Sequence, residues 1–448
     1  MNTKQIRQTI LDLAIRGELV PQDPTDEPAS VLLERIRAEK EQLIKDKKLK
    51  RDKKNNEPID EVPFELPEGW EWCRLGEVCE INPKNKLDDE LEVSFIPMPL
   101  ISDGFSNTHS FEIKKWNDIK KGYTHFRNGD IGVAKITPCF ENRKSVIFNN
   151  LKNGVGAGTT ELYILRSNLA LNKYLFWFVK TQDFINKGTE SFTGAVGQQR
   201  VSKDFIENTL IPLPPLAEQH RIAQKVEQLL AIVDTIEQLQ EQLKSDVKQA
   251  RNQVLNYAIA GKLTHQDPND EPAEELLKRI GKTTATDTPY EKLPKGWAWC
   301  RLGDITKTIA TKPYQILQSE IEKNGDFPVI SQSANYIEGF SSDETKVLKV
   351  EDFIIVFGDH TRVVKYIDFD FIVGADGVKV ILPNNNLSKY LYYLILNASY
   401  KIENRGYSRH FQFLQKEFFP LPPIAEQHRI VKKIETYFSF LDTIESNL

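Results

Sequence analysis

Cysteine is scarce in this sequence, and its spacing excludes two common kinds of site. The four cysteines are Cys73, Cys79, Cys139 and Cys300. None of them forms a CxxC pair, so the pattern predicts neither a zinc site nor a disulfide framework. Isolated thiols are typical of proteins from a reducing compartment, and we therefore expect a cytoplasmic location.

Long apolar segments are also missing. The sequence contains no run of 18 or more apolar residues, which excludes a membrane-spanning helix of ordinary length. The first 17 residues, MNTKQIRQTILDLAIRG, have an amphipathic pattern without a small-residue cleavage site. We therefore expect no signal peptide and no membrane partner.

Familiar catalytic motifs are absent as well. The sequence lacks a GxxxxGK[ST] phosphate loop, an HExxH metal motif and a GxSxG nucleophile motif. A GxGxG run at 154–158 is interpreted as a flexible loop, because it precedes a predicted strand and a nucleotide-binding glycine loop would follow one. Pro214 and Pro215 lie between leucines, which does not fit an Asn-Pro-Pro-aromatic methyltransferase motif. We expect no catalytic residue, cofactor or metal in this chain, and a self-sufficient methyltransferase or nuclease has no support.

A basic excess is missing too. The formal net charge is -5, and the isoelectric point is about 6.0. Free-standing nucleic-acid-binding domains usually carry a positive excess, because they must neutralise phosphates. If this chain binds nucleic acid, we expect a basic partner to contribute to the binding.

What the sequence does contain is an internal repeat in three parts. Residues 10–36 recur at 254–280, residues 66–77 recur as LPKGWAWCRLGD at 293–304, and residues 211–238 recur at 419–446. More than half of the positions are identical in each pair, in the same order. Such self-similarity indicates a duplicated architecture.

The segment 212–261 predicts one long helix, because apolar residues recur in it at spacings of three, four or seven. The predicted seam consists of Ile222, Val226, Leu229, Val233, Ile236, Leu243, Val247, Val254 and Ala258. A helix of about 45 residues would be roughly 65–70 Å long. The C-terminal segment 424–448 matches its first half, and the chain from residue 1 matches it from residue 245 onward. We infer a circular repeat in which the chain ends lie close together and pair with the central helix.

Two segments between the repeated parts read as short strands followed by a helix. The expected fold class is α+β, with two mixed α/β domains separated by a long antiparallel coiled-coil helix pair in approximate two-fold symmetry. The predicted divisions are 1–65, an N-terminal helical region; 66–211, a first recognition domain; 212–292, the central long-helix region; 293–419, a second recognition domain; and 420–448, a C-terminal helix.

Polar side chains cluster at predicted turns of both domains. Arg, Asn, Gln, Ser and Thr on loops are the residue types that read base edges in DNA. The candidate DNA-binding residues are Lys135, Thr137, Asn142, Arg143, Lys144, Gln198, Gln199 and Arg200 in the first domain, and Asp359, His360, Thr361, Arg362, Lys365, Arg405, Ser408, Arg409 and His410 in the second.

A Glu-Gln-His-Arg motif recurs on the predicted first turn of the central and C-terminal helices. Identical residues in both halves indicate either a scaffold role or a docking surface that is used twice. We predict subunit docking at Glu218, Gln219, His220, Arg221, Glu426, Gln427, His428 and Arg429.

The doubled PLPPxAEQHRI…DTIE and LPxGWxWCRLG motifs resemble those of the specificity subunit of type I restriction-modification enzymes, along the whole chain. The resemblance implies that each domain reads one half of a split site in double-stranded DNA, and that the helices set the spacing between the halves. It also implies two modification subunits, with S-adenosylmethionine and adenine N6-methylation, and two restriction subunits with ATP and magnesium, in a bacterial or archaeal cell. The start of this chain is circularly shifted, since a helix precedes the first domain.

A protein-only scaffold, whose two domains bind two protein partners, is the alternative that the near-neutral charge permits.

Overall fold

The longest element is helix α8, Leu216–Ile259, which confirms the predicted long helix. The computed structural model describes residues 2–46, 59, 61–195, 198–285, 292–375, 377–384, 387–403 and 409–448. The chain forms two compact units, Met1–Leu239 and Gln240–Leu448. Helix α8 therefore contributes its first half to unit 1 and its second half to unit 2.

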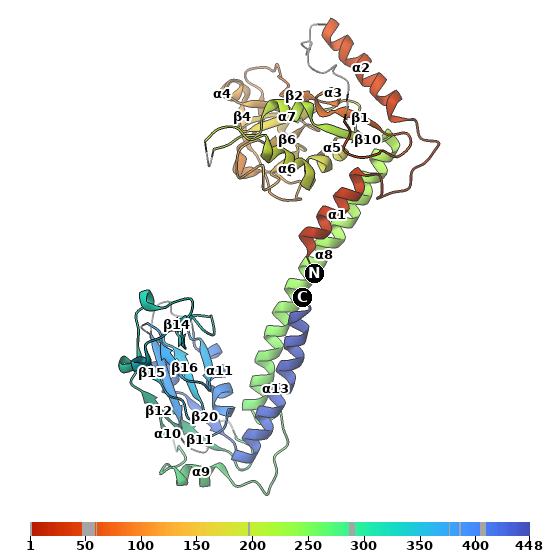
Figure 1. Cartoon of the computed structure of the whole chain (residues 1–448). Coiled ribbons are helices and arrows are strands. Elements are labelled where there is room, and N and C mark those ends of the chain that lie inside the picture. Colours follow the sequence, from red (N-terminus) through yellow and green to blue (C-terminus); the bar gives the residue numbers. More distant parts are fainter. Residues whose placement is uncertain are drawn as a thin grey trace. The chain divides into compact units, whose positions relative to one another are not determined.

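In unit 1, helix α1 (Thr3–Ile15) lies along the first half of α8 (Figure 1). The Arg7 guanidinium pairs with Asp234 at 2.6 Å and with Glu237 at 2.8 Å. Beyond the end of α1, Gln22 donates a hydrogen bond to Glu218 at 3.2 Å. Because the later residue contacts the earlier part of α8, the two helices are antiparallel, as the repeat predicts.

In unit 2, helix α13 (Ile424–Ser446) lies antiparallel to the second half of α8 (Figure 1). Arg251 of α8 pairs with Asp442 and Glu445, and the Gln240 side chain donates to the carbonyl oxygen of Leu448 at 2.7 Å. The predicted seam of α8 is largely correct. However, the predicted member Leu243 is 39% exposed, and Leu229 and Val254 are only partly buried, because their neighbours Leu230 and Leu255 lie in the core instead.

The first recognition domain consists of two four-stranded sheets and a small two-stranded one. The four-stranded sheets have the orders β2-β9-β6-β7 and β4-β3-β8-β5, with β3 and β8 parallel. The strands are β1 (Glu71–Arg74), β2 (Glu80–Ile81), β3 (Glu92–Ile96), β4 (Glu112–Lys115), β5 (Thr124–Arg127), β6 (Ile131–Ala134), β7 (Ser145–Ile147), β8 (Val155–Gly158), β9 (Leu162–Arg166) and β10 (Leu210–Leu213). Strand β1 pairs with β10, so the domain's entry and exit lie side by side.

The second recognition domain repeats this topology strand for strand. Its sheets have the orders β12-β19-β16-β17 and β14-β13-β18-β15, with β13 and β18 parallel, and β11 pairs with β20. The strands are β11 (Ala298–Arg301), β12 (Thr306–Ile309), β13 (Phe327–Ile330), β14 (Gly339–Ser341), β15 (Val347–Leu348), β16 (Ile354–Gly358), β17 (Val364–Ile367), β18 (Phe371–Val373), β19 (Val378–Pro383) and β20 (Phe418–Leu421). Adding ten to each strand number of the first domain gives the second, although the interiors of the two domains have no matching sequence.

One helix in each domain anchors the sheets to the helix pair. They are α5 (Asn172–Val179) and α11 (Tyr390–Lys401). Residues 174–179 are all buried, because this apolar helix packs between the sheet and the long helices. The remaining helices are α2 (Ala29–Lys45), α3 (Leu75–Val78), α4 (Trp116–Ile119), α6 (Gln182–Glu190), α7 (Lys203–Asn208), α9 (Ala273–Arg279), α10 (Leu302–Ile305) and α12 (Phe411–Leu414), and short 3₁₀ turns link several strands.

The GxGxG run is not the flexible loop that its sequence suggests. Its last two glycines lie in β8, which is hydrogen-bonded between β3 and β5. A Cβ atom on Gly156 would lie 2.5 Å from the Phe126 ring, and one on Gly158 would lie 2.3 Å from the carbonyl oxygen of Ile96. The glycines therefore serve close packing inside the sheet.

Candidate DNA-reading surfaces and the helix lock

In the first domain, the structure brings the two predicted polar segments together. Residues 135–144 follow β6, and residues 198–200 arrive from a later turn. The Thr137 amide donates to the carbonyl oxygen of Gln199 at 3.0 Å, and the Val201 amide donates to that of Lys135 at 2.8 Å. A β-bridge between Ile136 and Arg200 lies between these bonds. The two segments thus form one surface.

Most candidate side chains on this surface are at least partly exposed. Asn142 and Gln198 are exposed, while Lys135, Thr137, Lys144, Gln199 and Arg200 are half-buried. Arg200 pairs with Glu161 at 2.9 Å, and Lys144 with Asp103 at 3.2 Å. These pairs hold two cations in place; the Arg200 side chain stays 41% exposed, whereas that of Lys144 is only 14% exposed. Their contact with DNA stays a prediction.

Arg143 is the exception in the first domain. It is buried at 7% exposure, and its Nε donates to the carbonyl oxygen of Lys180 at 3.0 Å. Burial lowers the pKa of this guanidinium. The prediction that Arg143 contacts DNA is corrected, because its side chain points into the domain.

A second buried cation supports the same loop. The Lys180 ammonium donates to four backbone carbonyl oxygens, those of Gly104, Ser106, Arg143 and Ser145, at 2.7–3.0 Å. Burial lowers the pKa of Lys180 to about 7, whereas the four oxygens favour its charged form. Lys180 therefore supports the segment 135–144 from inside the domain. No motif or residue spacing in the sequence predicted this role.

In the second domain, the candidate segment after β16 meets the segment before α12. The His410 amide donates to the carbonyl oxygen of Asp359 at 2.8 Å, and the Phe411 amide donates to the Asp359 carboxylate at 2.8 Å. Thr361 and Arg409 are exposed, and His360 and Arg362 are half-buried. Arg362 also donates to the carbonyl oxygen of Ile402 at 2.6 Å. The candidates Arg405 and Ser408 lie outside the described residues.

Three candidates of the second domain are buried, which corrects their assignment as DNA contacts. Asp359, Lys365 and His410 are at most 3% exposed. The Lys365 ammonium donates to the carbonyl oxygens of Ser331 at 2.8 Å and Asn335 at 2.5 Å. Burial lowers its pKa to about 8. Lys365 thus braces its domain much as Lys180 braces the first.

The glutamate and glutamine of the Glu-Gln-His-Arg motif of α8 face inward. The Trp70 Nε1 donates to the buried Glu218 carboxylate at 3.0 Å, and burial raises the pKa of Glu218. The buried Gln219 amide donates to the carbonyl oxygen of Pro214 at 2.9 Å and accepts from the Leu171 amide at 2.8 Å. Arg221 pairs with Asp26 at 2.5 Å. We call this set the helix lock of unit 1.

Unit 2 contains the same lock. Trp297 Nε1 donates to Glu426 at 2.9 Å, and Gln427 donates to the carbonyl oxygen of Pro422 at 2.9 Å. Arg429 pairs with Asp270. Glu218, Gln219, Glu426 and Gln427 are at most 1% exposed, so the prediction that they dock partner subunits is corrected. His220 and His428 are exposed, and Arg221 and Arg429 are about one-third exposed; their docking role stays a prediction.

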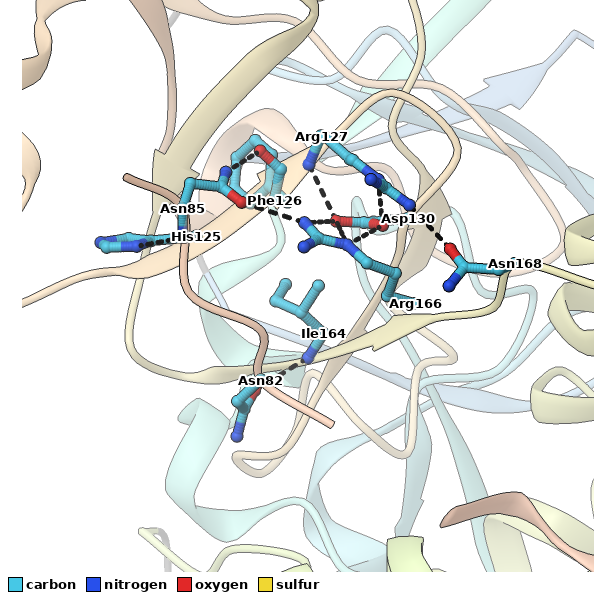
Figure 2. A network of polar contacts seen from close by, with 9 residues as sticks. All are labelled: Asn82, Asn85, His125, Phe126, Arg127, Asp130, Ile164, Arg166 and Asn168. Atoms are coloured by element: carbon cyan, nitrogen blue, oxygen red, sulfur yellow. Dashed lines mark hydrogen bonds and ion pairs between the residues drawn. The ribbon is translucent and has the colours of Figure 1, made fainter. Parts of the chain in front are cut away.

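A further network in the first domain joins the two four-stranded sheets (Figure 2). The buried Asp130 carboxylate accepts from Arg166 at 2.7 and 2.9 Å and from the Arg127 amide at 2.8 Å. Arg166 also donates to Asn85 at 3.2 Å, and Asn85 donates to the carbonyl oxygen of Phe126 at 3.0 Å. Because β5 belongs to one sheet and β6 and β9 to the other, this network fixes their mutual position.

The described residues contain no group of three or more His, Cys, Asp or Glu side chains that could hold a metal ion. No helix within these ranges is long and apolar enough to cross a membrane.

Two domains of one topology, each fixed to a long helix by the same lock and each carrying different polar loops, define a duplicated recognition protein. Residues 67–245 and 294–448 match the family model for the type I restriction modification DNA specificity domain. The chain therefore belongs to the type I restriction-modification specificity subunits. Members of this family are non-catalytic subunits that function with DNA and with restriction and modification subunits.

Curated relatives agree with this assignment. The chain is 38% identical to the type I restriction enzyme EcoAI specificity subunit of Escherichia coli, over 96% of this chain and 88% of the relative. It is 37% identical to the EcoEI specificity subunit of the same species, over 99% and 90%.

Solved structures agree on the fold. The HsdS subunit from Thermoanaerobacter tengcongensis is similar at 22% identity with a TM-score of 0.58, over 87% of this chain and 94% of that one. A chain from a study of complex assembly and conformational transition of the type I R-M system gives 0.65 at 22% identity, over 86% and 94%.

Proposed function

We propose that this chain reads a split site in double-stranded DNA, with one recognition domain for each half. One observation carries the proposal: the two domains share a strand topology and a helix lock but expose unlike loops. Asn142 and Gln198 belong to one reading surface, whereas Thr361 and Arg409 belong to the other. Amide and guanidinium groups recognise adenine and guanine edges in the major groove. Family membership favours this function over a protein-only scaffold.

We propose the same five divisions that the repeat predicts, with recognition domains at 66–211 and 293–419. The locks support these limits, since Trp70 and Trp297 stand at the entrances of the domains and Pro212 and Pro420 lie on the exit strands. The long helix between the domains would then set the number of unread bases.

We further propose that two modification and two restriction subunits complete the complex in the cytoplasm of a bacterial or archaeal cell. S-adenosylmethionine, ATP and magnesium would reside in those partners, and adenine N6 would be the methylated atom. The negative net charge of -5 supports shared DNA binding, because the partners would supply cations for the phosphates. Exposed His220 and His428 are the proposed docking positions.

An exchange of residues 293–419 for the second recognition domain of a relative tests the central claim. We expect the methylated sequence, mapped by sequencing modified adenines, to change in one half of the site only. The reciprocal exchange of residues 66–211 should change the other half. A change in both halves after one exchange would contradict the modular assignment, and loss of all methylation with an intact complex would contradict DNA reading by these domains.

A further inference from the structure

The connection between β13 and β14 lies against the candidate reading segment of the second domain. The Thr361 hydroxyl donates to the main-chain carbonyl oxygen of Gln332 at 2.6 Å, and the His360 amide donates to the Gln332 side-chain oxygen at 3.2 Å. A Cβ atom on Gly377, in the turn before β19, would lie 2.5 Å from the Gln332 side chain. Gln332 is thus held between two turns, and residues 331–338 belong to the same surface as Thr361.

A buried cation also holds this connection. The Lys365 ammonium, on β17, donates to the carbonyl oxygens of Ser331 and Asn335. Because Lys365 is buried, these bonds are shielded from water and fix the main chain at both residues. Asn335 follows Gln332 by three residues, so the two lie no more than about 11 Å apart. Three consecutive base pairs occupy about 10 Å along a DNA strand, so both parts of the surface can reach one half-site.

The Asn335 side chain is the group of this connection that suits a base edge. Asn335 is exposed, and within the described ranges its side-chain amide has no hydrogen-bond partner. By contrast, the Tyr336 hydroxyl donates to the carbonyl oxygen of Tyr366, and the Glu338 carboxylate accepts from two serines. An asparagine amide offers a donor and an acceptor together, which match N7 and N6 of adenine in the major groove. Asn335 therefore combines a fixed main chain with an available amide.

The first domain has the same arrangement with unrelated residues. The corresponding connection, between β3 and β4, meets residues 135–144 where the Gly104 amide donates to the carbonyl oxygen of Asn142 at 2.8 Å. The carbonyl oxygens of Gly104 and Ser106 accept from the buried Lys180 ammonium. Because the domain interiors have no matching sequence, this repeated contact follows from the shared strand order. A third segment beside the reading surface is therefore a property of the fold.

We propose that the β13–β14 connection is a third DNA-reading segment of the second domain and that Asn335 determines specificity for an adenine. The Asn335 amide donates to N7 of that adenine and accepts from its N6 amino group, while Lys365 keeps the main chain of Asn335 in place. This inference rests on the proposed function, since it assigns one base contact within one half-site. It adds a residue to Thr361 and Arg409, which belong to the same surface.

Competition binding of the complete complex to DNA duplexes tests this contact. Mapping of modified adenines identifies the wild-type site, and duplexes with each single base-pair change in either half then serve as competitors. We expect Asn335→Ala to reduce the preference for adenine at one position of the second domain's half-site by at least about tenfold. The preferences in the other half should not change. Asn324→Ala is the matched control, because Asn324 is also exposed but precedes β13, at the opposite end of that strand.

A second variant separates base reading from a merely structural role. A carboxylate accepts from N4 of cytosine but has no donor for N7 of adenine. We therefore expect Asn335→Asp to replace the adenine preference at the same position by a preference for cytosine, in a complex that assembles as the wild type does. Unchanged base preference in both Asn335 variants, or equal weakening toward every duplex, would overturn the inference. Failure of the proposed function would be recognised separately, because the wild-type complex would then prefer no split site.

Discussion

Each glutamate of the repeated motif accepts a hydrogen bond from a tryptophan far away in the sequence. The separation is 148 residues for Glu218 and Trp70, and 129 residues for Glu426 and Trp297. These contacts connect the entrance of each recognition domain to the first turn of a long helix. A substitution at such a position removes the acceptor from a buried donor, which costs more than the hydrogen bond itself contributes.

We predict that Glu218→Leu destabilises unit 1 by about 2–3 kcal/mol, because Trp70 and Gln22 lose their acceptor. Urea unfolding followed by hydrogen exchange would measure the loss, and Glu426→Leu should act in the same way on unit 2. His220→Ala is the matched control on the same turn: we expect it to change stability by less than about 0.5 kcal/mol and to weaken binding of the modification subunit. Equal losses of stability in both variants would refute the lock.

The Glu218 carboxyl also predicts a pH dependence. Burial raises its pKa in the folded state, so the carboxyl takes up a proton on folding. Its contribution to stability is therefore largest below the unfolded pKa and is lost as the pH rises through the folded value. Glu218→Gln, which cannot titrate, should remove this part of the pH dependence when urea unfolding is compared across that range. An unchanged pH profile would contradict the prediction.

The two buried lysines brace different domains, and we predict separable effects of their substitution. Lys180→Met would leave four carbonyl oxygens without their donor and should cost at least about 3 kcal/mol. Reading of one half-site should weaken first, as measured by methylation of sites mutated in either half. Lys365→Met should impair the other half. The prediction fails if each variant affects both halves alike.

At the scale of elements, the sequence predicts structure that depends on local contacts and misses structure that depends on contacts between distant residues. Helix α8 was predictable, because its apolar spacing is a local pattern. The repeated segments at the two chain ends also indicate which helices pair with it. The shared strand order of the two domains was not, since β3 pairs in parallel with β8 some 60 residues later and the domain interiors have no similarity. The buried states of Lys365 and His410 depend on such distant pairings, and polar residues near a turn give no sign of them.

The exposed loops support a prediction for each half of the DNA site. Asn142→Ala should relax base preference in one half, and Arg409→Ala should do so in the other. One lost side-chain contact to a base is expected to cost about 1–3 kcal/mol of discrimination. Binding of the complete complex to site variants would measure it. Uniform weakening across all sequences would instead assign these side chains to phosphates.

At the scale of the whole molecule, α8 runs unbroken through the limit between the units at Leu239. We predict that inserting four residues after Leu239, which adds about 6 Å of helix, lengthens the unread spacer by about one or two base pairs. Mapping of methylated sites would show the change. Both half-sites should stay the same, and an unchanged spacer would show that the helix does not set the spacing.

The pairing of α13 with the second half of α8 has a consequence for biosynthesis. Unit 1 is one continuous segment, so it can fold while the rest of the chain is still being made. The apolar seam of Val247, Leu255 and Ala258 is synthesised long before Ile430 and Ile434, which belong to the helix that lies along it. The nascent chain must therefore carry an uncovered seam through the synthesis of the whole second recognition domain. If translation stops before residue 424, the released protein has a folded unit 1 and a second half of α8 whose apolar seam is exposed.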